Sequence, residues 1–136
     1  ERAMAHAIYI NLPVADLAGA MRFYQALGLA SDPQFSGADG GCITISEGIR
    51  LMLCPHEKFR SFTPKAICDT RQAVEMLLNL QCDSRAEVDQ LVARALAAGG
   101  STYDQPEDLG FMYSHSFVDP DGHGWGLFSL TSAPPT

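Results

Sequence analysis

The chain has 136 residues, of which 46% are hydrophobic, and this is the size and composition of one ordinary globular domain. Its 9 basic residues are outnumbered by 16 acidic ones and are scattered, so the net charge of −7 argues against a nucleic-acid partner. No apolar run approaches the roughly 18 residues that span a membrane, and the start of the chain shows no signal peptide. We therefore expect a cytoplasmic protein with no membrane and no nucleic-acid partner.

The chain also carries few marks of the common catalytic classes. Its four cysteines form no CxxC pair, which indicates free, apolar thiols in a reducing compartment. There is no Gly-x-Ser-x-Gly nucleophile motif and no glycine-rich phosphate loop. Hydrolases of the nucleophilic serine type and nucleotide-binding enzymes are therefore not expected.

The first half of the chain predicts a strand, a helix and a hairpin, in that order. Residues 7–14 are a β-rich apolar run, and Asp16 is a residue type that caps helix N-termini. Apolar side chains recur at helical spacing until Gly28, and they are Leu17, Ala20, Met21, Tyr24 and Leu27. The runs "GCITIS" and "IRLMLC", separated by Glu47-Gly48, then predict two strands of a hairpin.

The second half repeats this order. Residues 74–82 are strand-like, and Ser84 with Glu87 matches a helix-starting capping box. Apolar positions at helical spacing follow as far as Gly99-Gly100, and they are Val88, Leu91, Val92, Ala95 and Leu96. The runs "GFMYSHSFV" and "HGWGLFSL", separated by a turn at Asp121-Gly122, predict two more strands.

This repetition predicts an α+β fold in which residues 1–136 form a single domain made of two βαβββ units. The units cover about residues 6–55 and 74–130, and a connector of residues 56–73 joins them. An α+β sandwich without a true repeat would show the same order of elements, and this alternative stays open.

Two segments resemble the opening and closing signatures of the vicinal oxygen chelate superfamily, which includes glyoxalase I, bleomycin-resistance proteins and extradiol dioxygenases. They are "NLPVADLAGAMRFYQALGL" and "FVDPDGHGWGLF". "FTPKAICDT" and residues 84–89 further resemble the branch called predicted lactoylglutathione lyases. The resemblance implies two βαβββ units whose curved mixed sheets surround a cup, with the helices outside. It also implies a homodimer that covers the sheet edges.

Members of this superfamily often hold a divalent metal through four side chains in the cup, two from each unit. The positions that match in this chain are Tyr9, Met52, Leu77 and Gly126. None of these residues is a usual ligand for such a metal, and a register shift of one residue brings in none either. We therefore expect no metal and no other cofactor, although the family leaves a divalent metal open.

Two asparagines follow the lost ligand positions by two residues each, so that strand alternation predicts Asn11 beside Tyr9 and Asn79 beside Leu77 on the same face. Uncharged amides inside a sheet need hydrogen-bonding partners. Either they pair with each other or with the backbone, or they orient a polar ligand together with Gln81.

Histidine and aromatic side chains complete the candidate site. His115 lies between Ser114 and Ser116 in a strand that we expect to help form the cup, and either it or Tyr9 is the candidate acid or base if the protein is an enzyme. A vacant position 126 would widen the cup toward aromatic rings. The full set of candidate ligand-binding residues is Tyr9, Asn11, Met52, Asn79, Gln81, Tyr113, His115 and Trp125.

These residues favour a metal-free protein that binds a small organic molecule, in the manner of the bleomycin-resistance proteins. The alternative is a glyoxalase-like lyase or isomerase, of the lactoylglutathione lyase type, with an atypical metal site. A third hypothesis is a purely structural or protein-interaction dimer whose cup is filled by its own side chains.

Overall fold

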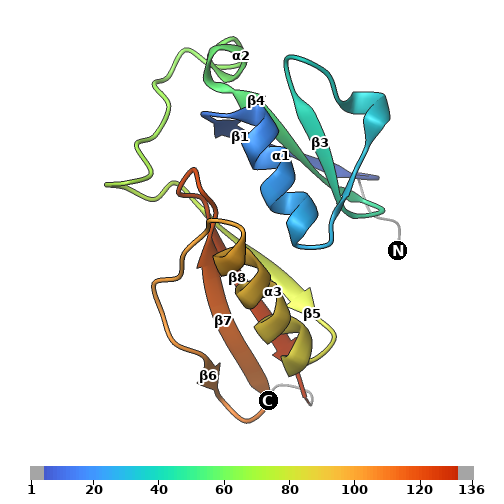
Figure 1. Cartoon of the computed structure of the whole chain (residues 1–136), viewed down its shortest axis with the longest axis vertical. Coiled ribbons are helices and arrows are strands. Elements are labelled where there is room, and N and C mark those ends of the chain that lie inside the picture. Colours follow the sequence, from blue (N-terminus) through green and yellow to red (C-terminus); the bar gives the residue numbers. More distant parts are fainter. Residues whose placement is uncertain (1–4, 132–136) are drawn as a thin grey trace. The chain divides into compact units, whose positions relative to one another are not determined.

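Two sheets of four strands each make up the fold, and a long helix packs on each sheet (Figure 1). The computed structural model describes residues 5–131. The chain divides into two compact units, Glu1–Ile67 and Cys68–Thr136.

The sheet of the first unit has the strand order β1-β4-β3-β2, with β1 parallel to β4 and the other neighbours antiparallel. The elements in chain order are β1 (Ile8–Val14), α1 (Leu17–Ala26), β2 (Ala30–Ser31), the 3-10 helix η1 (Pro33–Phe35), β3 (Gly41–Ser46), β4 (Ile49–Pro55) and α2 (His56–Arg60).

Helix α1 begins where the sequence predicts, because the Asp16 side chain accepts a hydrogen bond from the backbone N–H of Gly19 at 3.2 Å. The helix buries Ala20, Phe23 and Tyr24. The matching side of the sheet consists of fully or almost fully buried apolar residues of β1, β3 and β4, namely Leu12, Val14, Ile43, Leu51 and Leu53. These side chains form the core of the first unit.

The sheet of the second unit has the equivalent order β5-β8-β7-β6, with β5 parallel to β8. Its elements are β5 (Leu77–Cys82), α3 (Arg85–Ala97), β6 (Glu107–Asp108), β7 (Met112–Val118) and β8 (Gly124–Leu130). Helix α3 is capped by Ser84, whose Oγ accepts from the N–H of Glu87 at 3.1 Å. The Glu87 carboxylate accepts from the N–H of Asp83 at 3.3 Å, which completes the predicted cap one residue earlier than a standard capping box.

The core of the second unit lies between α3 and its sheet. Val88, Val92 and Ala95 of the helix are buried. Phe117 and Trp125 stack with ring centroids 5.9 Å apart and are 1% and 2% exposed. Burial of such large side chains supplies most of the stability of a small unit.

The order strand, helix and three strands occurs in both units, so the α+β fold with two βαβββ units is confirmed. The strand predicted over residues 74–82 is shorter than expected and begins at Leu77, because residues before it have no strand partner and Val74 is 71% exposed. No helix within residues 5–131 combines the length and the apolar character that crossing a membrane requires.

Candidate functional site

Each sheet has one side covered by its long helix and one side without it, and we call the second the open face. Strand alternation and the observed register assign the side chains of the second unit's open face. They are Leu77, Asn79 and Gln81 of β5, Gly124, Gly126 and Phe128 of β8, and Met112, Ser114 and Ser116 of β7.

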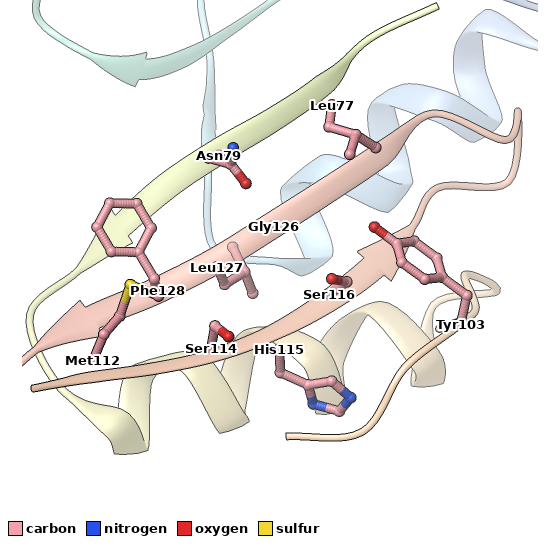
Figure 2. Close-up of a pocket in the computed structure, with 10 residues that line it drawn as sticks. All are labelled: Leu77, Asn79, Tyr103, Met112, Ser114, His115, Ser116, Gly126, Leu127 and Phe128. Atoms are coloured by element: carbon pink, nitrogen blue, oxygen red, sulfur yellow. The ribbon is translucent and has the colours of Figure 1, made fainter. Parts of the chain in front are cut away.

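A cavity of about 420 Å³ lies on the open face of the second unit. Figure 2 shows the residues that line it, which are Leu77, Asn79, Tyr103, Met112, Ser114, His115, Ser116, Gly126, Leu127 and Phe128. Apolar side chains form most of the wall, and an amide and hydroxyl groups are placed among them. The volume of this cavity lies within the range of small-molecule sites, and the cavity is partly open rather than enclosed.

The floor of the cavity is a row of three residues across three strands. Asn79 is the register partner of Gly126, and Gly126 is the partner of Ser116. A Cβ atom at position 126 would overlap Oδ1 of Asn79, so the Asn79 side chain lies over the glycine. The Asn79 side chain is exposed, and no group within the described part of the second unit hydrogen-bonds to its amide.

Ser116 is held by the loop that runs beside β7. Its Oγ donates to Oδ2 of Asp104 at 2.6 Å, and its backbone N–H donates to Oδ1 at 3.2 Å. Thr102 in the same loop donates from its hydroxyl to the Ser116 carbonyl at 2.8 Å. On the other side of the carboxylate, Nε2 of His115 lies 3.4 Å from Asp104 Oδ1. Ser116 is therefore held by two hydrogen bonds to one carboxylate, one from its hydroxyl and one from its backbone N–H.

The other predicted residues of the second unit divide between the two sides of the sheet. Gln81 lies on the open face and is exposed. Trp125 lies on the helix side, where it is buried against Phe117. Tyr113 also lies there and donates from its hydroxyl to Asp89 of α3 at 2.6 Å.

His115 contributes to the cavity lining, but its ring is directed away from Ser114 and Ser116, as Figure 2 shows. Neighbouring residues of a strand point to opposite sides. The side chains of Ser114 and Ser116, on either side of His115 in the sequence, therefore face the floor of the cavity, and the His115 ring does not. Position 126 therefore widens the site toward serines and Asn79 rather than toward Trp125 and Tyr113.

The predicted residues of the first unit share the open face of its sheet. Tyr9 is 49% exposed and packs edge-on against Phe35, with ring centroids 6.3 Å apart. Asn11 is the register partner of Met52. Its Oδ1 accepts a long contact of 3.9 Å from the Cys54 thiol, so its amide is almost without a partner in this unit.

The family model of the Glyoxalase/Bleomycin resistance protein/Dioxygenase superfamily matches residues 5–127. The chain belongs to this superfamily. No protein of curated function matches it.

Among solved structures of similar fold, a hypothetical protein of S. aureus is 27% identical, with a TM-score of 0.79 and coverage of 94% of this chain and 96% of that one. A glyoxalase-related enzyme from Fulvimarina pelagi is 22% identical, with a TM-score of 0.79 and coverage of 98% and 94%. A genomically encoded fosfomycin resistance protein from Listeria monocytogenes is 21% identical, with a TM-score of 0.68 and coverage of 98% and 97%. The last two likenesses concern the fold alone.

The residues of this superfamily member do not fit the divalent metal that related proteins often hold. The register places Met52 and Gly126 at the same point of each sheet, diagonal to Tyr9 and Leu77. The thioether of Met52, the hydrogen atom that is the side chain of Gly126 and the aliphatic side chain of Leu77 are not ligands for a hard or borderline cation. Within residues 5–131, no three His, Cys, Asp or Glu side chains come together as a metal site either.

The sequence did not point to Ser116 and Asp104, which the structure adds to the candidate site. Ser116 could have been found, because it alternates with His115 in the strand and pairs with the glycine of the closing signature. Asp104 could not, because it lies in a loop with no regular period that pairs with β7 only in the folded unit.

The buried thiol of Cys82 is expected to react slowly. Burial, followed by the nearby Glu87 and Asp83 carboxylates, raises its pKa from 9.0 to about 11. At pH 8 its thiolate fraction is then about 100-fold lower than that of an ordinary thiol. Alkylation with iodoacetamide followed by peptide mass spectrometry should modify the half-exposed Cys68 first and leave Cys82 intact.

The same shift makes stability depend on pH. Because the folded state raises the pKa, the contribution of Cys82 is fully present below pH 9 and is lost as the pH rises toward 11. Urea unfolding at pH 8 and pH 10.5 should show a loss for the native chain that is smaller in Cys82→Ala. An equal loss of unfolding free energy in both proteins would contradict the raised pKa of Cys82 as the cause.

Proposed function

We propose that this superfamily member binds a small organic molecule on the open face of its second unit, without a divalent metal. The observation that carries the proposal is the row Asn79–Gly126–Ser116 on the floor of a cavity of about 420 Å³. A polar group at the bottom of an apolar cavity orients a ligand, while the apolar wall supplies most of the binding free energy.

The free amide of Asn79 supports a binding role over a filled, purely structural face. The Asn79 side chain is exposed, so a ligand that covers it must replace the water bonds of the amide with hydrogen bonds of its own, and this selects a ligand with a polar group. The side chain lies above Gly126, so it reaches into the space where a metal-binding relative would carry a side chain.

The alternative is a glyoxalase-like lyase or isomerase that uses Tyr9 or His115 as its acid or base. The pairing of His115 with Asp104 at 3.4 Å is the observation in its favour, since a carboxylate commonly orients a catalytic imidazole. The imidazole is directed away from the floor of the cavity, however, and this favours binding without chemistry.

A homodimer is part of the proposal. β1 and β5 each form an edge of their own sheet, and apolar side chains are exposed on both, with Ile8 at 55% and Leu77 at 55%. Exposed apolar edge strands favour association.

Native mass spectrometry combined with metal analysis tests these points together. The chain should be purified without chelators and without an immobilised-metal column. We expect dimers that carry a retained small molecule and less than about one-tenth of a divalent ion per subunit. One tightly bound divalent ion per subunit would contradict the proposal and favour the lyase.

Replacing Gly126 by alanine should remove binding while preserving the fold. The new methyl group overlaps Asn79 Oδ1, and this exposed side chain can rotate away at a cost within about 1 kcal/mol of unfolding free energy. The displaced amide no longer reaches the ligand, so the share of protein that carries the retained molecule should fall about tenfold. Gly37→Ala is the control, because no atom lies within 4 Å of its added Cβ. Full retention of the molecule in Gly126→Ala would exclude Asn79 from the site.

A further inference from the structure

We infer that the floor of the cavity in the second unit receives a positively charged hydrogen-bond donor, namely the protonated amine of a ligand with an apolar body. This inference rests on the proposed binding function and specifies its ligand. It follows from the hydrogen-bonding capacity of Ser116, from the free amide of Asn79 and from the charge of Asp104.

Ser116 can only accept a hydrogen bond from a ligand. A serine hydroxyl has one hydrogen to donate and two lone pairs that accept. The hydrogen of Ser116 is committed to Asp104 Oδ2 at 2.6 Å, and the backbone N–H of the same residue holds the other carboxylate oxygen at 3.2 Å. Both oxygens of the Asp104 carboxylate accept hydrogen bonds from Ser116. If the Ser116 hydroxyl turned its hydrogen toward the cavity, it would lose a strong, charge-assisted hydrogen bond.

Asn79 offers a second acceptor in the same row. Its Oδ1 lies over Gly126, the residue that separates Asn79 from Ser116 in the register. The Asn79 side chain is exposed, and no group of the described second unit hydrogen-bonds to its amide. A ligand group between the two side chains therefore meets the Ser116 lone pairs on one side and an amide oxygen on the other, and a donor with several hydrogens satisfies both.

The charge around this point is negative. Asp104 carries a carboxylate directly behind the Ser116 hydroxyl, and its nearest ionisable partner is His115 rather than a lysine or arginine. None of the described residues that line the cavity is a lysine or an arginine. A carboxylate near a half-enclosed site attracts a cation and repels an anion, and the low local dielectric strengthens both effects.

The walls specify the rest of the ligand. Leu77, Met112 and Phe128 line the cavity on either side of the polar row. An aromatic or aliphatic body fits these side chains, and the methionine thioether adapts to rings of different shape. The chemical class is thus a hydrophobic amine.

Three probes with one ring and different head groups test this: benzylammonium, benzyl alcohol and benzoate. Each is titrated into the isotopically labelled full chain at pH 8, and backbone amide shifts are followed by NMR. We expect benzylammonium to bind about tenfold more tightly than benzoate, with the largest shifts on β5, β7 and β8.

Asp104→Asn removes the charge, and Asp89→Asn is the matched control. Asp89→Asn makes the same change in net charge. Asp89, however, lies on α3, where its carboxylate accepts a hydrogen bond from the Tyr113 hydroxyl on the helix side of the sheet. We expect Asp104→Asn to weaken benzylammonium binding about tenfold and to leave benzyl alcohol within about twofold, whereas Asp89→Asn changes neither by more than about twofold.

Each other outcome is decisive. Benzoate binding as tightly as benzylammonium would overturn the inference and leave the proposed binding function standing. Equal losses in the two variants would show that net charge, rather than Asp104, selects the amine, and would overturn the assignment. If none of the probes shifts an open-face amide at about 20 mM, where a fragment of this size should bind a cavity, both the inference and the proposed function fail.

Discussion

Replacing Trp125 by alanine is expected to lower the free energy of unfolding by about 3–5 kcal/mol. The ring is 2% exposed and stacks on Phe117 at 5.9 Å with an interplanar angle of 9°, so alanine leaves a large cavity between α3 and its sheet. Urea unfolding followed by circular dichroism measures the loss without relying on the fluorescence of this single tryptophan.

The matched control is Tyr103→Ala, because Tyr103 is also aromatic but is 59% exposed and lines the cavity. Its unfolding free energy should stay within about 0.5 kcal/mol of the native value. The two variants separate a core role from a binding role. If Trp125→Ala weakened ligand binding with little loss of stability, the ring would be a ligand platform and its placement in the core would be wrong.

Replacing Gly122 by alanine should cost about 2–3 kcal/mol of unfolding free energy. This glycine of the Asp-Pro-Asp-Gly turn has φ 90°, in the left-handed region, which alone costs an alanine about 1–2 kcal/mol. In addition, the new methyl group overlaps the Thr70 side chain, whose hydroxyl donates to the Asp121 carbonyl at 2.5 Å. Thermal and urea unfolding both measure the loss.

Gly110→Ala isolates the second contribution. Gly110 has φ 89°, almost the same value, but no atom lies within 4 Å of its added Cβ. The unfolding free energy of Gly110→Ala should therefore fall only by the cost of placing an alanine in the left-handed region. The difference between the two variants, about 1 kcal/mol, measures how much the packing of Thr70 on the turn stabilises the unit. Equal losses would mean that this docking does not stabilise the unit.

The fold was predictable because its signals are local. Alternating apolar residues define the strands, and Asp16 and Ser84 start both helices through hydrogen bonds to N–H groups only three residues away. Period-two alternation also places Tyr9 with Asn11 and Leu77 with Asn79, and the observed register agrees with both pairs. The empty ligand position at Gly126 follows from the closing signature alone.

The sequence by itself thus determined the α+β class, the two βαβββ units, the superfamily and the unsuitability of the four metal positions. Only the tertiary structure decided which side of the sheet each candidate residue of β7 and β8 occupies. Tyr113 and Trp125 lie on the side covered by α3, and the ring of His115 is directed away from the floor of the cavity. It also brought Asp104 to Ser116 and Thr70 to the turn at Gly122. The reason is physical: periodicity encodes contacts within an element, whereas a loop residue finds its partner only when the sheet and helix have already packed.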